Sequence, residues 1–412
     1  MIKVAQIQFS MESGGRAALR MQRAFIKKGV QSDIVSLNYN TQVNSGITYL
    51  NKWSKVISKI DNKLQSIITR KIIPQRGSFS YPILGSDVSK LKVIKEADYI
   101  YIHWALNGML NFNSIKKIAQ LGKPVIIFLH DMWAITGGCH HSFECSKYKT
   151  TGCNACPMFT SSKKNDLSAR EFKKKLKLYS SFNNFYFIAP SKWLYGCAKE
   201  SLLTKNKPVF YIPNILDDAV YKKNNKAVAR QLLNLPQDET IVAFGAIEIS
   251  SPYKGWPYLK KALEIIHEET KDKKISVLIF GSCNKKLMDE AIPFKTVFMG
   301  YLKDEYTAAL IFNAADIIIV PSLAEAFGYV VMESLSCGTP VVAFNVGGIP
   351  DLIRHKQNGY LAKLKDENDL ANGIRFCLNN DVKGFLPEDL IPALTIQKHL
   401  DLLSHINDVK NK

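Results

Sequence analysis

The chain has 412 residues, of which 46% are hydrophobic and 22% are charged. This length exceeds the size at which a single hydrophobic core stops growing, so we expect two domains. The composition is that of a globular protein and excludes disordered, collagen-like and repetitive chains. The longest apolar runs fall far short of the roughly 20 residues that a membrane-spanning helix needs, so we expect a soluble, cytoplasmic protein.

The formal net charge of +19 indicates anionic partners. Basic residues concentrate in residues 52–76 and 163–177. The second segment interleaves apolar residues with lysines at roughly helical spacing. It is either a solvated helix face or a helix that lies on anionic lipid, and both interpretations stay open. No recognised nucleic-acid module accompanies the charge, so nucleic acid is not an expected partner.

The first half of the chain alternates short apolar runs with helical patterns. Residues 4–9 predict a strand, and residues 16–29 predict a helix that ends at Gly29. Continuous apolar runs are typical of strands that are buried on both faces of a parallel sheet. Residues 40–85 are irregular and basic and receive no assignment. Further strands are predicted at residues 33–37, 99–104, 124–130, 185–190 and 209–214.

The second half repeats this alternation. Two consecutive sets of strand–helix units predict two doubly wound α/β domains, with ligands outside the carboxyl ends of the strands. We expect an acceptor-side domain at 1–212, a nucleotide-sugar domain at 213–384, and a helical tail at 385–412 that could pack back on the first domain. The strands are predicted at 241–246, 276–282, 296–301, 316–322 and 340–345, and the helices at 255–269, 307–315, 329–338 and 366–380.

The most informative motif spans residues 321–353. Glu325 and Glu333 lie eight positions apart, and a predicted helix begins after Gly328. The free N–H groups and the dipole of a helix N-terminus favour a phosphate. Glu325 precedes the helix and could point at a ligand, whereas Glu333 could accept both hydroxyls of a ribose diol. The alternatives are plain surface and capping glutamates, or a hydrolase with two facing carboxylates.

A second motif ends with Lys254-Gly255, where a loop that follows a strand opens a predicted helix. The Lys254 ammonium could stabilise the negative charge that develops on a leaving diphosphate. The alternative is a surface charge at the start of a helix.

A third motif lies in the first half. His130 and Asp131 follow the predicted strand at 124–130, and His103 and Trp104 end the strand before it. His130 could donate a hydrogen bond to a sugar hydroxyl or to developing charge, or it could be structural. His103, Trp104 and Asp131 are candidate acceptor-site residues, although Trp104 could equally be plain packing.

Four of the 8 cysteines lie close together in the sequence, with the spacing C-x5-C-x7-C-x2-C. Such a cluster in a cytosolic protein favours a metal over disulfides, and four thiolates suit a tetrahedral, structural Zn²⁺. His140 or His141 could replace one thiolate, and free thiols or disulfides are the alternatives. The expected ligands are Cys139, Cys145, Cys153 and Cys156.

The segment 321–353 resembles the E-x7-E signature of the retaining group 4 glycosyltransferases. The resemblance implies the GT-B fold, in which two doubly wound, parallel-sheet (Rossmann-like) domains face each other across a cleft. It implies that Glu325 and His130 contact the donor sugar, that Glu333 holds the ribose, and that Lys254 meets the diphosphate. The family's usual loop arginine is replaced by Ala246 or a neighbour, with Lys303 or Arg354 as candidate substitutes. The other expected donor-binding residues are Gly15, Gly245, Gly300, Tyr301, Leu302, Phe327, Gly328 and Tyr329.

Residues 101–157 resemble one subgroup, the transferases of bacterial exopolysaccharide and colanic-acid-type assembly, which carry HDMW followed by a Cys-rich loop, here at 137–157. The implied function is retaining transfer of a sugar from a UDP- or GDP-linked donor to a glycan acceptor. The expected acceptor is a lipid-linked oligosaccharide of exopolysaccharide, capsule or O-antigen synthesis. The protein is expected to meet it at the inner face of the cytoplasmic membrane. No cofactor is expected for catalysis.

Three other functions are the alternatives. An NAD-dependent oxidoreductase needs G-x-G-x-x-G after a strand, and neither residues 13–18 nor residues 244–250 supply it. A nucleotide-sugar 2-epimerase of similar fold would act on the donor without an acceptor. A non-catalytic membrane-surface scaffold would tolerate the loss of Glu325, Glu333 and Lys254.

Overall fold

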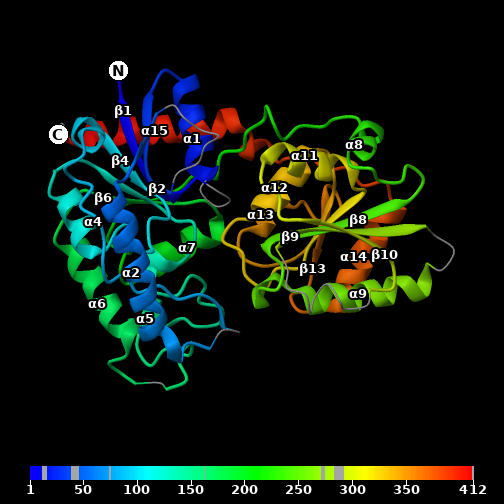
Figure 1. Ribbon diagram of the computed structural model, residues 1–412, viewed down its shortest axis with the longest axis horizontal. Helices are drawn as coiled ribbons and strands as arrows, with labels where there is room; N and C mark the ends of the chain where they lie inside the picture. Colours follow the sequence, from blue (N-terminus) through cyan, green and yellow to red (C-terminus); the bar gives the residue numbers. More distant parts are fainter. Residues whose placement is uncertain are drawn as a thin grey trace. The chain divides into compact units, whose positions relative to one another are not determined.

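A computed structural model describes residues 1–11, 16–38, 46–73, 76–161, 163–270, 274–282 and 292–410. The chain divides into two compact units (Figure 1). The first comprises residues 1–215 together with 393–412, and the second comprises residues 216–392. The boundary at 215–216 lies close to the expected 212–213, and residues 385–392, which were expected in the tail, belong to the second unit.

The first unit contains a parallel sheet of seven strands in the order β3-β2-β1-β4-β5-β6-β7. Every residue of β4 and β5 is buried, as their continuous apolar sequences predict. The chain crosses from one side of β1 to the other between β2 and β4, so the sheet is doubly wound. The strands are β1 Lys3–Ser10, β2 Gln31–Asn38, β3 Ile47–Tyr49, β4 Tyr99–Ile102, β5 Val125–Phe128, β6 Phe185–Ala189 and β7 Val209–Tyr211.

The helices of the first unit include one from the far end of the chain. In α15, the Leu403 carbonyl accepts a 2.8 Å hydrogen bond from the Tyr99 hydroxyl, and His399 Nδ1 lies 3.3 Å from the Tyr101 hydroxyl. Leu403 therefore joins the same hydrophobic core as Phe25. The helices are α1 Arg16–Lys27, α2 Lys52–Ile68, α3 Lys92–Glu96, α4 Phe112–Ala119, α5 Lys147–Thr150, α6 Leu167–Ser180, α7 Lys192–Glu200 and α15 Pro392–Lys410, with 3-10 turns η2 Thr69–Lys71 and η4 Trp133–Ile135.

The second unit contains a parallel sheet of six strands in the order β10-β9-β8-β11-β12-β13. Successive residues of a strand point to opposite faces. Ile241 and Ala243 accordingly pack in one core cluster with α11–α13, while Val242 and Phe244 pack in another with α9 and α14. The prediction of two doubly wound parallel sheets is confirmed. The strands are β8 Thr240–Glu248, β9 Ile275–Ser282, β10 Lys295–Gly300, β11 Ile317–Val320, β12 Val341–Phe344 and β13 Gly359–Ala362.

The helices of the second unit lie on both faces of its sheet (Figure 1). Among all described helices of the chain, none combines the length and the apolarity needed to cross a bilayer. The helices of this unit are α8 Lys226–Leu232, α9 Trp256–Glu269, α11 Glu305–Ala314, α12 Tyr329–Ser336, α13 Ile349–Leu352 and α14 Glu367–Asn379, with 3-10 turns η5 Pro252–Lys254 and η6 Glu388–Leu390.

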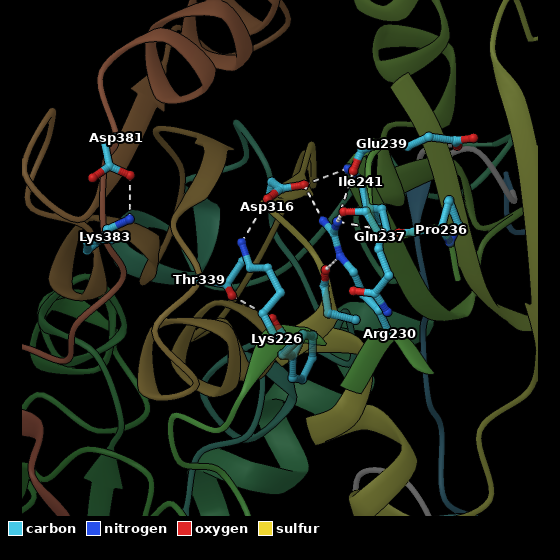
Figure 2. A network of polar contacts seen from close by, with 12 residues as sticks. Lys226, Arg230, Pro236, Gln237, Glu239, Ile241, Asp316, Thr339, Asp381 and Lys383 are labelled. Atoms are coloured by element: carbon cyan, nitrogen blue, oxygen red, sulfur yellow. Dashed lines mark hydrogen bonds and ion pairs between the residues drawn. The ribbon is translucent and has the colours of Figure 1, made fainter. Parts of the chain in front are cut away.

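A polar network joins the amino ends of β8 and β11 (Figure 2). Asp316, which precedes β11, accepts 2.7 Å bonds from the Arg230 guanidinium, from the Lys226 ammonium and from the backbone N–H of Ile241 in β8. The buried Arg230 also donates to the carbonyls of Ala314, Gln237 and Glu239 at 3.0 Å. One carboxylate and one guanidinium therefore hold two neighbouring strands and α8 together.

We expect Asp316→Ala to lower the free energy of unfolding by about 3 kcal/mol, because it leaves the buried Arg230 charge without its carboxylate. Chemical denaturation followed by circular dichroism measures this change. The exposed ion pair of Lys383 and Asp381, also drawn in Figure 2, supplies the control. Lys383→Ala should leave the denaturation midpoint unchanged, and equal effects of the two substitutions would contradict the structural role of Asp316.

Candidate active site

The candidate site of the second unit is built from two loops that leave the carboxyl ends of β8 and β11. These strands pair directly, and the chain crosses over between them, which is the position where doubly wound sheets bind ligands. The Leu323 N–H in one loop donates a 2.7 Å bond to the Tyr253 carbonyl in the other. Gly255 packs so closely that any side chain there would collide with the Pro321 carbonyl. Lys254 is thus held beside residues 321–328.

Lys254 and Glu325, which were expected to act from separate motifs, are in direct contact. The Lys254 Nζ atom lies 3.2 Å from Glu325 Oε2, and the two side chains are only 23% and 19% exposed. This partial shielding strengthens the electrostatic interaction relative to one on the open surface. A bound anion would therefore compete with Glu325 for the Lys254 ammonium.

A third loop, which follows β12, fixes the backbone of Glu325. The Gly348 N–H donates a 3.0 Å bond to the Glu325 carbonyl. Gly347 has a φ of +55° and leaves no room for a side chain, which would collide with the same carbonyl. The sequence analysis did not include these two glycines among the site residues. Their adjacent positions after a buried strand are the signal that could have revealed them.

Two helices of this site begin at glycines. Gly255 is the N-cap of α9 and Gly328 is the N-cap of α12, so neither cap has a side chain that could bond the first N–H groups. The helix dipole makes the N-terminal end of each helix favourable for negative charge. Together with Lys254, these two ends make the carboxyl edge of β8 and β11 suited to an anion.

The α12 helix carries Glu333, whose side chain is 8% exposed. Burial, and then the negative charge of Glu333, raise the pKa of the Cys337 thiol to about 12. The Phe327 side chain is 3% exposed and packs in the core, edge-on to Tyr329 with ring centroids 5.9 Å apart. At Phe327, therefore, only the backbone is placed to meet a ligand.

The other expected donor-binding residues are placed less closely together. Gly300 ends β10, and Tyr301 and Leu302 follow it; β10 is separated from β8 by β9. Gly245 lies against the Phe280 ring, where a side chain would collide, so sheet packing accounts for this glycine. Gly15 lies outside the described residues.

The candidate substitutes for the family's loop arginine are exposed. Lys303 follows β10, and Arg354 follows α13, where its N–H donates a 2.7 Å bond to Asn358. The buried Arg230 is no substitute, because it belongs to the network at the opposite, amino ends of β8 and β11.

In the first unit, one side chain from the middle of β1 and two that follow the carboxyl ends of β4 and β5 form a hydrogen-bonded row. His103 Nδ1 lies 2.9 Å from His130 Nε2, and His103 Nε2 lies 2.9 Å from the amide of the fully buried Gln6. The amide orientation that satisfies both ends of Gln6 has its NH2 group donating to His103 Nε2. His103 then donates from Nδ1 to His130 Nε2, which leaves His130 with a proton on Nδ1.

Burial lowers the pKa of His130 to about 4 and lowers the pKa of His103 well below its usual range. Both rings are therefore neutral near pH 7. A neutral His130 with its proton on Nδ1 can donate a single hydrogen bond but does not bring a positive charge. The sequence identified His103 and His130 separately, and it gave no sign of Gln6.

Asp131 belongs to a second hydrogen-bonded row. Its Oδ2 lies 2.6 Å from His140 Nδ1, and His140 Nε2 lies 2.8 Å from the Ser80 hydroxyl. Its Oδ1 accepts a 2.7 Å bond from the Trp133 N–H. Burial alone would raise the pKa of Asp131, but His140 lowers it below its usual range. Both carboxylate oxygens already have partners, so the expected acceptor role of Asp131 finds no support here.

The expected acceptor residues His103, Trp104 and Asp131 line one cavity together with His130. The cavity measures about 40 Å³ and is otherwise lined by apolar side chains such as Leu106. A space of this size holds water rather than a sugar. The cavity by itself is therefore no acceptor pocket.

The four cysteines of the expected zinc site lie in one region. The Gly137 N–H donates a 3.1 Å bond to Cys153 Sγ, and Cys139 and Cys156 share one small hydrophobic cluster. Lys147, two residues after Cys145, donates to the carbonyls of the two residues between Cys153 and Cys156. Within the described ranges, however, no three His, Cys, Asp or Glu side chains are arranged as ligands of one ion. His140, one suggested ligand, has both ring nitrogens engaged.

Two charged residues of α6 are buried beneath this region. The Lys175 ammonium donates to the carbonyls of Trp133 and Thr136 at 2.5 and 3.0 Å and lies 3.7 Å from the Trp133 ring centroid. Neither carboxylate oxygen of Glu171 has a hydrogen-bond partner among the described residues. Burial raises the pKa of Glu171 to about 7 and lowers the pKa of Lys175 to about 8.

The first unit should lose stability as Glu171 ionises. The folded pKa of about 7 exceeds the ordinary value of 4.5, so the stabilisation by the protonated form is complete below pH 4.5 and is lost as the pH rises through 7. Relative to Glu171→Gln, the free energy of unfolding should fall by about 3 kcal/mol between pH 4.5 and pH 8. Denaturation across this range measures the difference. Glu144→Gln, at an exposed glutamate, should keep the pH dependence of the unsubstituted protein. If the stability curves of Glu171→Gln and of the unsubstituted protein run parallel over this pH range, the prediction is wrong.

Solved structures of low sequence identity share this two-unit architecture. Anabaena HepE in complex with UDP and glucose is 16% identical, with a TM-score of 0.61 and coverage of 100% of both chains. A glycosyltransferase from Rickettsia africae is 15% identical, with a TM-score of 0.64 and coverage of 100% of this chain and 99% of that one. The protein therefore has the two-domain GT-B fold, as expected.

Sequence comparisons point to the second unit. Residues 238–380 match the family described as Glycosyl transferases group 1. The D-inositol 3-phosphate glycosyltransferase of Mycobacteroides abscessus is 34% identical over 182 residues, which are 41% of this chain and 39% of that protein. An uncharacterized glycosyltransferase of Methanocaldococcus jannaschii is 30% identical over 149 residues, which are 35% of this chain and 37% of that protein. The matches span about two-fifths of these relatives. Residues 238–380, which lie within the second unit, are thus similar to the group 1 glycosyltransferases.

Proposed function

We propose that the protein is a retaining glycosyltransferase that moves a sugar from a nucleoside-diphosphate donor to a glycan acceptor. The contact between Lys254 and Glu325 carries the proposal. It places a cation and a carboxylate together at the crossover of the second sheet, within the segment that matches the group 1 family. Complexes of the similarly folded HepE with UDP and with UDP-glucose support a uridine donor, and a guanosine donor is the alternative.

In the proposed reaction, the bond between the anomeric carbon and the diphosphate breaks, and a bond to the acceptor oxygen forms. The acceptor's hydroxyl proton passes to the leaving diphosphate. Lys254 turns from Glu325 to the diphosphate and stabilises the charge that develops there, assisted by the α12 N-terminus. Glu325 is thereby released to contact the donor sugar, and Glu333 binds the ribose. No cofactor takes part in this step.

His130 is proposed as a hydrogen-bond donor to a sugar hydroxyl. Burial keeps His130 neutral, and the row through Gln6 and His103 leaves its proton on Nδ1; both observations support this role. A fixed, neutral hydrogen-bond donor orients a sugar hydroxyl without attracting the anionic diphosphate of the nucleotide sugar.

The proposed acceptor is a lipid-linked oligosaccharide of bacterial exopolysaccharide, capsule or O-antigen synthesis. The net charge of +19 and the resemblance of residues 101–157 to exopolysaccharide transferases support it. So does the likeness in fold to WaaG, a glycosyltransferase involved in lipopolysaccharide biosynthesis (TM-score 0.58, 13% identity). The inositol phosphate relatives make a small phosphorylated acceptor the alternative. A 2-epimerase would instead convert the donor without any acceptor.

We expect UDP at about 100 times its Kd to stabilise the protein by roughly 2.7 kcal/mol, which is visible as a rise in melting temperature. Lys254→Ala should abolish the rise because it removes the cation that meets the diphosphate. Lys261→Ala is the matched control, since Lys261 lies on α9 with its side chain 63% exposed. GDP, CMP and NAD are tested separately as alternative ligands.

A rise with GDP in place of UDP would change the donor base and keep the proposal. A rise in melting temperature with NAD alone, or a rise with UDP that persists in Lys254→Ala, would contradict the proposed function. Glu325→Gln should bind UDP normally and lose sugar transfer, which separates donor binding from chemistry.

A structural zinc ion at Cys139, Cys145, Cys153 and Cys156 is a separate proposal. The soft, four-thiol donor set supports it, and the present arrangement of the side chains does not, because they would have to turn toward one point. The ion would supply cross-linking of the 137–157 loop and no catalytic chemistry.

Metal analysis of the purified protein should find about one zinc per chain. Cys153→Ser together with Cys156→Ser should remove it, whereas Cys337→Ser together with Cys377→Ser, at buried thiols of the second unit, should retain it. A metal-free protein whose melting temperature ignores a chelator would end the zinc proposal.

A further inference from the structure

The α2 helix is amphipathic in the reverse sense. Its buried side chains are all polar, and five of its large apolar side chains are exposed, whereas Ile57 and Leu64 are partly buried. Trp53 is 75% exposed, and Val56, Ile60 and Ile67 are 43%, 47% and 52% exposed. A helix of a globular protein normally turns its apolar stripe toward the core. The buried residues are Ser54, Ser58, Asp61 and Gln65.

Hydrogen bonds to the backbone explain why the polar side is buried. Asp61 Oδ1 accepts 2.9 and 2.8 Å bonds from the N–H groups of Ile83 and Leu84. Gln65 accepts a 3.0 Å bond from the Tyr81 N–H and donates to Asp61 at 2.5 Å. Residues 81–84 belong to no strand, so the helix side chains satisfy the N–H groups of Tyr81, Ile83 and Leu84.

A second contact fixes the rotation of the helix. The Ser58 hydroxyl donates a 2.5 Å bond to the Asn107 carbonyl, and the next residue, Gly108, is so close that a Cβ there would lie 2.5 Å from Ser58 Cα. The helix cannot roll its apolar side inward without breaking these bonds. The exposure of Trp53 is therefore a consequence of a specific docking rather than of loose packing.

The apolar side forms one continuous stripe. Trp53, Val56, Ile60 and Ile67 follow one another at intervals of three, four and seven residues, which places them on one face. Exposed apolar residues are ordinary when they are scattered, but a contiguous stripe headed by a tryptophan marks an interaction surface. Ile68 extends the stripe at the end of the helix with 37% exposure.

The charge beside this stripe identifies the partner. The exposed lysines Lys52, Lys59 and Lys63 recur at intervals of seven and four and so form a row along one flank of the stripe. Asp61 is the sole acidic residue in the sequence from 52 to 71, and it is buried. The exposed surface of α2 thus carries positive charges and no negative charge. Lysines beside an apolar stripe with an interfacial tryptophan match an anionic lipid surface.

The competing helix α6, which covers the basic segment 163–177, does not fit this role. Its Phe172, Leu178 and Tyr179 are buried in the core, and so is Lys175. Leu176 is its exposed large apolar residue, at 43%. Of the two interpretations of α6, the solvated helix face is the one that the structure supports.

We propose that α2 docks the protein on an anionic lipid surface. The Trp53–Ile67 stripe enters the boundary between headgroups and acyl chains, and the lysine row contacts lipid phosphates. The inference extends the lipid-linked acceptor of the proposed function, but vesicle binding is measured without donor or acceptor. Its failure would leave the UDP-dependent rise in melting temperature untouched, so the two can fail independently.

Flotation with vesicles of phosphatidylcholine, with and without 30% phosphatidylglycerol, tests the docking. The full chain should bind the anionic vesicles at low salt and lose binding as salt rises. Lys52→Gln, Lys59→Gln and Lys63→Gln together should weaken binding about 100-fold, at roughly fivefold per lysine. Trp53→Ser with Ile60→Ser should weaken it at least tenfold, with an unchanged melting temperature because both side chains face solvent.

The matched control lies on α6, where Lys173→Gln and Lys177→Gln with Leu176→Ser remove comparable exposed groups and should leave binding intact. Equal loss in the two sets, or no binding to anionic vesicles, would overturn the proposal. So would a dimer in sedimentation analysis that the α2 substitutions dissociate, because it would assign this face to a second copy of the chain.

Discussion

The half-buried carboxylate of Asp316 holds together the two strands on which the candidate active site depends. At their amino ends, β8 and β11 are joined through this carboxylate to Arg230 and Lys226. At their carboxyl ends, the same two strands release the loops that carry Lys254 and Glu325. Because neighbouring parallel strands are only about 5 Å apart, fixing one end of the pair also limits the separation of the loops at the other. The distance between Lys254 and Glu325 thus depends in part on a contact at the opposite end of the same two strands.

The two units differ in how charge is distributed around their candidate site residues. In the second unit, charge is concentrated: an ammonium, a carboxylate and glycine-capped helix N-termini meet at one edge of the sheet. In the first unit, charge is suppressed, because burial keeps His103 and His130 neutral while Gln6 orders their hydrogen bonds. The first arrangement suits a diphosphate and the second suits uncharged hydroxyls. This division agrees with the roles proposed for the two ends of a nucleotide sugar.

Much of the fold could be predicted from the sequence, because buried parallel strands are continuous apolar runs and Lys-Gly or Glu-x7-Glu patterns follow them. The contact between Lys254 and Glu325 was not readable, since it joins loops 71 positions apart. The rows through Gln6 and His140 were missed for the same reason: each partner looks ordinary within its own segment. The α2 helix lies in the unassigned region 40–85, although its apolar residues recur at helical intervals. The sequence did not reveal that the polar side of this helix is the buried one. In the 163–177 segment, the apolar and basic pattern did not reveal that Lys175 points inward.

The placement of α15 bears on the order in which the protein acquires its structure. The Tyr99 hydroxyl bonds to a carbonyl 304 positions later in the chain, and Leu403 and Ile406 belong to the core of the first unit. The ribosome delivers these residues only after the whole second unit has emerged. The second unit, whose strands and helices are contiguous in the sequence, can therefore finish folding while the first still lacks part of its core. The usual N-to-C order of co-translational folding can thus be inverted in this chain. The core around Phe25 and Tyr101 is covered only when α15 has been synthesised and packs against it.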